Sequence, residues 1–138
     1  VRMDRHCENT QKLAEYLEAH DSVKWVKYGG LLSSPYNELS NKYTNGKPSG
    51  ILSFGIKGGK ESGITFIDSL NLITRLVNIG DTKSLATHPA STTHSQLDES
   101  DFESAGISSD MIRISVGIEN IDDIIADVDQ AILKSQKS

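Results

Sequence analysis

Apolar residues recur at helical spacing near both ends of the chain. In residues 2–20 a moderately apolar stripe repeats every three or four positions and predicts a helix; its members are Cys7, Thr10, Leu13, Ala14 and Leu17. A second stripe follows Asn120, which can cap a helix, and Asp122 and Asp123 then fall where the helix dipole favours acids. This stripe predicts the final helix and consists of Ile121, Ile124, Ile125, Val128 and Ile132.

Between these helices, alternating and clustered apolar residues predict strands. The alternation is clearest in residues 51–56, where Leu52, Phe54 and Ile56 share one face. In residues 111–116 the apolar face is equally regular, and Arg113 lies on the opposite face. Shorter apolar runs predict two further strands, one at residues 23–28 and one around residues 76–79 within the segment 71–83.

Three further helices are expected, at residues 35–43, 60–70 and 98–105. The second of them is expected to bury Ile64, Phe66, Ile67 and Leu70. Residues 87–96 are rich in Ser, Thr and His and are expected to form an irregular loop. The order of elements predicts the α+β class: one domain, residues 1–138, with a small, mostly antiparallel sheet and helices on one face.

Composition narrows the function classes. The 138 residues carry a formal charge of −5, which disfavours nucleic-acid binding because phosphate contacts need a clustered basic face. No apolar run approaches the roughly 20 residues that span a bilayer, so we expect no membrane partner either. The single cysteine, Cys7, fits a cytoplasmic location and is interpreted as a small core residue. Because Val1 leads directly into an uncapped helix, we interpret the chain as a fragment.

The common catalytic signatures are missing from the sequence. It has no Gly-rich phosphate loop ending in Lys-Ser/Thr and no nucleophile elbow. His88 and His94 are six positions apart without a nearby cysteine, so no metal site is expected.

Two features leave both a structural and a functional interpretation open. The polar residues 80–94 suit the lining of a site, but flexible linkers share this composition. Arg113 is either a solvated side chain on a sheet face or a guanidinium fork for a carboxylate, a task that an arginine on a rigid strand serves well.

Both features resemble a known family. Residues 78–94 resemble the signature G-D-x-x-S/T-L-x-x-H-P-A-S-x-T-H of the pyridoxal-phosphate (PLP) enzymes of cysteine and methionine metabolism. Residues 112–119 resemble that family's R-x-S-x-G-x-E strand, and residues 5–9 and 50–59 resemble its inter-domain helix and first central strand. Within this family, residues 6–9 (His-Cys-Glu-Asn) and 91–94 (Ser-Thr-Thr-His) are most similar to those of O-acetylhomoserine sulfhydrylases. Methionine γ-lyases come next in similarity, followed by cystathionine γ-synthases and lyases.

The resemblance implies a role for several residues. Arg113 is expected to grip the α-carboxylate of an amino-acid substrate, and Ser84 to lie near the Schiff-base lysine and orient it. Leu85 is expected to contribute backbone or wall contacts to the substrate. The remaining three residues are expected to order the loop: His88, Thr92 and His94.

The resemblance also implies that cofactor binding and substrate binding are assigned to different domains. The chain would be the C-terminal domain of a fold-type I PLP enzyme, with residues 1–20 ending the inter-domain helix. The large domain, absent here, would hold PLP, so no cofactor-binding residue is expected in this chain and the chain alone would be inactive. The parent enzyme would be a homotetramer that makes homocysteine or methionine from O-acetylhomoserine and sulfide or a thiol.

Two other interpretations stay open at this point. The chain could be a freestanding, non-catalytic module that binds amino acids through Arg113. It could also be the remnant of a degenerate gene without a function of its own.

Overall fold

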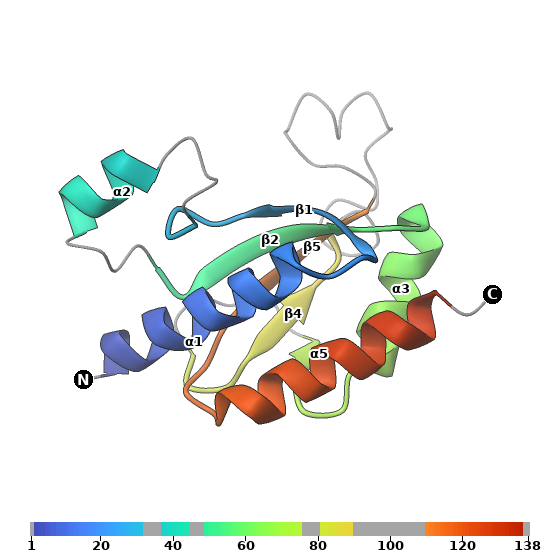
Figure 1. The fold of residues 1–138 in the computed structure, drawn as a ribbon. Helices are drawn as coiled ribbons and strands as arrows, with labels where there is room; N and C mark the ends of the chain where they lie inside the picture. Colours follow the sequence, from blue (N-terminus) through green and yellow to red (C-terminus); the bar gives the residue numbers. More distant parts are fainter. Residues whose placement is uncertain (1, 32–36, 45–48, 76–80, 90–109, 137–138) are drawn as a thin grey trace.

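A five-stranded sheet in the order β1-β2-β5-β4-β3 forms the centre of the molecule (Figure 1). The computed structural model describes residues 2–31, 37–44, 49–75, 81–89 and 110–136. Three neighbouring pairs of strands are antiparallel, and β3 and β4 are parallel. The strands are β1 (Val23–Lys27), β2 (Ile51–Ile56), β3 (Thr74–Arg75), β4 (Leu85–Thr87) and β5 (Met111–Ser115). The predicted α+β class with a mostly antiparallel sheet is confirmed.

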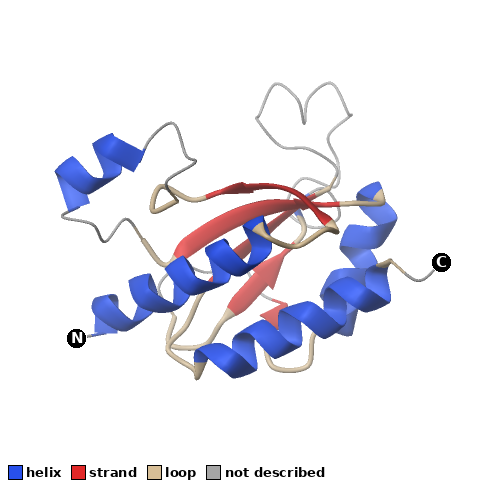
Figure 2. Ribbon diagram, viewed as in Figure 1, coloured by secondary structure: helices blue, strands red, loops and turns tan. Residues whose placement is uncertain are grey.

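In the described part of the chain, helices α1, α3 and α5 cover one face of the sheet, and α2 stands apart from them (Figures 1 and 2). The covering helices are α1 (Arg2–Glu18), α3 (Gly59–Ser69) and α5 (Ile121–Ser135). The separate helix is α2 (Asn37–Thr44). No helix of the described ranges is both long enough and apolar enough to cross a bilayer.

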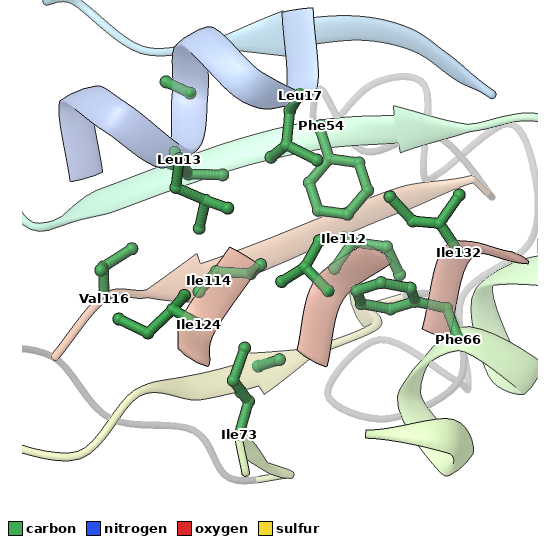
Figure 3. Close-up of a cluster of buried hydrophobic side chains, with 14 of the residues drawn as sticks. Leu13, Leu17, Phe54, Phe66, Ile73, Ile112, Ile114, Val116, Ile124 and Ile132 are labelled. Atoms are coloured by element: carbon green, nitrogen blue, oxygen red, sulfur yellow. The ribbon is translucent and has the colours of Figure 1, made fainter. Parts of the chain in front are cut away.

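The core lies between this helical layer and the sheet (Figure 3). The rings of Phe54 on β2 and Phe66 on α3 meet edge to face, with centroids 5.5 Å apart. Ile112 and Ile114 of β5 are fully buried in the same cluster, and Ile121 and Ile125 of α5 are partly buried against it. The fully buried members from the two helices are Leu13, Ala14, Leu17, Ile124, Val128 and Ile132. The side chain of Asn120 accepts a hydrogen bond from the Asp122 backbone N–H (2.8 Å), so the predicted cap of the final helix is confirmed.

The structure corrects three details of the sequence prediction. Ile64 was expected inside but is 37% exposed, because the buried face of α3 consists of Gly63, Phe66 and Ile67. Thr87 was expected in a loop but ends strand β4. In the segment 71–83 a strand was expected around residues 76–79, whereas the described strand β3 lies ahead of this centre, at Thr74–Arg75. The predicted strand at 76–79 and helix at 98–105 lie outside the described residues, as does the expected loop beyond Pro89.

Candidate functional site

Arg113 lies in the middle of the central strand, on the face of the sheet opposite to the helices. Its neighbours Ile112 and Ile114 point into the core, and successive side chains of a strand point to opposite faces. Across the sheet, Arg113 pairs with Ser53 of β2 on one side and with Thr87 of β4 on the other. Ser53 in turn pairs with Lys27 of β1. These four residues therefore form a row of hydroxyl and cationic side chains across the sheet.

The Arg113 guanidinium is available for a ligand as far as the described residues go. Its side chain is half-buried, and it makes no hydrogen bond or ion pair with another described residue. No carboxylate occupies the row on either side of it. A guanidinium fork on a rigid strand can form two parallel charge-assisted hydrogen bonds with a carboxylate. This arrangement can bind an anionic group of a small molecule.

Ser84 is held by the residues that follow β5. Its hydroxyl donates to Oε1 of Glu119 and accepts from the Gly117 N–H, both at 2.8 Å. The Ser84 backbone N–H donates to the other oxygen of Glu119, also at 2.8 Å. The Ser84 carbonyl accepts from the backbone N–H of Thr74 at 3.1 Å. Ser84 is completely buried, so its polar groups are satisfied inside the chain.

Helix α1 holds the same end of β5. Nδ1 of His6 lies 2.6 Å from the carbonyl oxygen of Val116, so Nδ1 carries the proton of this bond. The Asn9 amide donates to the carbonyl oxygens of Gly117 (3.0 Å) and Glu119 (2.9 Å). His6 and Asn9 are both buried. The end of β5 is therefore fixed from two sides, by α1 and by Ser84.

The other predicted site residues separate in space. Leu85 is buried next to Ser84 and pairs with Ser115. His88 is also buried, but its ring lies against α3, where a Cβ on Gly63 would come within 2.7 Å of its Nε2. Thr92 and His94 lie outside the described residues. Within the described ranges, no three His, Cys, Asp or Glu side chains gather in a way that could hold a metal ion.

The sequence interpretation gave no role to Glu119, Gly117, His6 or Asn9. All four stand in the quoted motifs, and this was the only signal that could have singled them out. Their contacts join positions 33 to 110 residues apart, which no local pattern reveals.

Known proteins with sequences similar to this chain belong to one enzyme family. Residues 1–133 match the family model described as Cys/Met metabolism PLP-dependent enzyme. An O-acetyl-L-homoserine sulfhydrylase of Thermus thermophilus is 47% identical over 96% of this chain and 31% of its own length. An L-methionine gamma-lyase of Fusobacterium nucleatum is 42% identical over 97% of this chain and 34% of its own length. The chain thus spans about a third of the curated relatives it matches.

A solved structure shows the same fold. The crystal structure of a Campylobacter jejuni protein, titled O-acetylhomoserine (thiol)-lyase with N'-pyridoxyl-lysine-5'-monophosphate, superposes with a TM-score of 0.89 at 44% identity. The match covers 96% of this chain and 31% of that chain. The family model matches nearly the whole chain, and the fold agrees with that of the solved structure. The chain therefore belongs to the Cys/Met metabolism PLP-dependent enzyme family.

Proposed function

We propose that this chain supplies the substrate-carboxylate site of an O-acetylhomoserine sulfhydrylase. The observation that carries the proposal is the position of Arg113, whose guanidinium has no partner among the described residues on the face opposite to the helices. The α-carboxylate of an amino acid matches this fork in charge and in planar shape. Two parallel hydrogen bonds fix the orientation of the substrate as well as its affinity.

Among the described residues of this chain, no lysine offers a site for the cofactor. Every lysine in the described part of the chain is solvent-exposed, and none lies in an enclosed site. In this family PLP supplies an electron sink for the carbanions that form next to the amino group. We therefore place cofactor binding in a large domain of the full-length protein, outside these 138 residues, and expect the chain alone to be inactive.

The substrate assignment follows the names of the relatives. Proteins named O-acetyl-L-homoserine sulfhydrylase are 47–48% identical to this chain. The reaction replaces the γ-acetoxy group of O-acetylhomoserine with sulfide, so homocysteine and acetate are formed. The 42% identity to an L-methionine gamma-lyase supports a second candidate, in which the same carboxylate site serves elimination from methionine. Release of acetate from O-acetylhomoserine and of methanethiol from methionine distinguishes the two.

The proposal extends to the assembly and location of the full-length protein. We expect a homotetramer in the cytoplasm, as the family resemblance implies. Light scattering on the purified full-length protein measures the first of these directly.

The test of the proposed function is the substitution Arg113→Lys in the full-length protein. A lysine keeps the charge but loses the bidentate geometry, so we expect KM for O-acetylhomoserine to rise about 100-fold, the equivalent of about 3 kcal/mol. The matched control is Arg75→Lys, because Arg75 is exposed and pairs only loosely with Asp68 (3.7 Å). An unchanged KM in the Arg113 variant would rule out the proposed carboxylate site.

A further inference from the structure

Ser84, just before β4, is hydrogen-bonded to Gly117 and Glu119, just after β5, and we call this contact the β4–β5 junction. The inference drawn from it rests on the proposed function and deepens it. Strand β4 has only three residues, and its outer neighbour β3 has two. So short a strand makes few ladder hydrogen bonds of its own. Its register against β5 nevertheless decides where Thr87 lies relative to Arg113. A slip by one residue would turn a side chain to the other face of the sheet.

We propose that Glu119 and Ser84 act together as positioning residues that hold Arg113 at the substrate carboxylate. The Glu119 carboxylate accepts from both the hydroxyl and the N–H of Ser84, with one oxygen for each. The same hydroxyl accepts from the Gly117 N–H and so continues the β4–β5 pairing past Ser115. One residue further, the Ile118 N–H donates to the carbonyl of Thr82 at 3.0 Å.

The junction is also closed on its other sides. The Val116 N–H donates to the Gly50 carbonyl at 2.7 Å, which ties the end of β5 to the start of β2. From α1, His6 and Asn9 bind the carbonyls of residues 116, 117 and 119. The backbone groups at this end of β5 thus make hydrogen bonds with neighbouring elements. Arg113 therefore projects from a strand whose end is held on both sides.

This role differs from direct contact between Ser84 and the cofactor lysine. The only proton of the Ser84 hydroxyl goes to Glu119, and the residue has no exposed surface through which a lysine of another domain could reach it. The effect of Ser84 on catalysis then passes through β5 and Arg113. The two roles predict different measurements, because one concerns substrate affinity and the other the ionisation of the cofactor.

The experiment compares Ser84→Ala and Glu119→Gln with wild type in the full-length holoenzyme. The amide that Glu119→Gln introduces would offer a donor where Ser84 needs an acceptor, so each variant breaks the same cluster. We expect the Kd for a non-reacting carboxylate analogue and KM for O-acetylhomoserine to rise about tenfold, the equivalent of one hydrogen bond. The pH at which the visible cofactor band titrates should stay that of wild type.

Two further readouts separate positioning from a general loss of stability. Amide hydrogen exchange at Gly117 should accelerate about tenfold while exchange in the middle of β2 stays unchanged. The double variant should weaken binding no more than either single variant, because both remove one cluster. Matched controls are Ser69→Ala, whose hydroxyl bonds only within its own helix, and Glu61→Gln on the exposed first turn of α3. If Glu119→Gln does not fold, Ser84→Ala provides the same measurements.

The outcomes distinguish this inference from the proposed function. If Arg113→Lys weakens carboxylate binding but neither Ser84→Ala nor Glu119→Gln does, the positioning role is wrong and the proposed function stands. A shifted titration of the cofactor band with unchanged Kd would assign Ser84 to the lysine and overturn the inference. If Arg113→Lys itself leaves binding unchanged, the proposed function fails, and the inference fails with it.

Discussion

At the residue scale, the close approach at Gly117 is the tightest constraint around the candidate site. A Cβ at this position would fall 2.6 Å from the carbonyl carbon of Lys83 and closer still to the oxygen of Thr82 and the carboxylate of Glu119. Two of these three atoms belong to the backbone and cannot move aside cheaply. Any side chain at position 117 would therefore push β5 away from the Ser84 segment.

We expect Gly117→Ala to lower the free energy of unfolding by about 2–3 kcal/mol, because overpacking of this kind strains the backbone. Gly59→Ala provides the control, since its Cβ would meet nothing within 4 Å and only its positive φ of 73° costs stability. That cost is about 1 kcal/mol. Urea unfolding of both variants measures the difference. Equal losses in the two would show that the contacts around Gly117 are looser than described.

At the scale of elements, a carboxylate from α5 fixes the chain that leads into β3. Asp127 is nearly buried, and its oxygens accept from three consecutive backbone N–H groups, of Asn71 (2.8 Å), Leu72 (2.9 Å) and Ile73 (2.9 Å). Gln130 donates to the same carboxylate at 3.0 Å. The start of β3 is thereby tied to the helical layer.

Asp127→Ala should destabilise the protein by about 2–4 kcal/mol, because it leaves three backbone donors without their acceptor. Asp123→Ala, on the exposed first turn of the same helix, should cost at most about 1 kcal/mol through the helix dipole. Thermal or urea unfolding of the two variants compares them directly. A loss for Asp127→Ala no larger than that of the control would contradict the role of this carboxylate.

The contact between α1 and α5 makes stability depend on pH. The Tyr16 hydroxyl donates to Asp129, and Nε2 of His20 lies 3.4 Å from the same oxygen. Burial, and then the Asp129 carboxylate, raise the pKa of Tyr16 in the folded protein. In the unfolded chain the pKa of tyrosine returns to about 10. The stability that this group contributes is therefore complete below pH 10 and is lost as the pH rises toward the folded pKa.

Urea unfolding between pH 8 and pH 11 tests this effect. We expect the free energy of unfolding to fall above about pH 10 in wild type and to fall less steeply in Tyr16→Phe. Part of the dependence should remain in the variant, because burial also raises the pKa of Tyr28. Identical pH profiles for wild type and Tyr16→Phe would show that the Tyr16 hydroxyl is not protected in the folded state.

At the scale of the whole molecule, the elements with long regular patterns could be predicted from the sequence. The stripes of α1 and α5 and the alternation in β2 and β5 each identify a buried face without outside information. Strand β4 could not be found in this way, because all three of its residues are buried and no alternation results. Ile64 was misplaced because the side of α3 that faces the core depends on the ring of Phe54 and on His88, which are distant in sequence.

In the candidate site, too, some residues could be predicted from the sequence and others could not. Arg113 stands out in the sequence because it is a charged residue on the polar face of an otherwise clear strand. Glu119 and Asn9 do not, because their partners lie 35 and 108 residues away. The family resemblance supplied the motifs, and the structure supplied the contacts within them.

The most direct test of the account pairs Arg113 with the group it is proposed to bind. Binding of O-acetylhomoserine and of its α-carboxamide is measured in the full-length wild type and in Arg113→Lys. We expect wild type to bind the carboxylate about 100-fold more tightly than the carboxamide, and the variant less than about tenfold more tightly. The reason is that the bidentate pair needs both the carboxylate of the ligand and the guanidinium of Arg113. A preference that persists undiminished in the variant would show that another residue binds the carboxylate and would contradict the account.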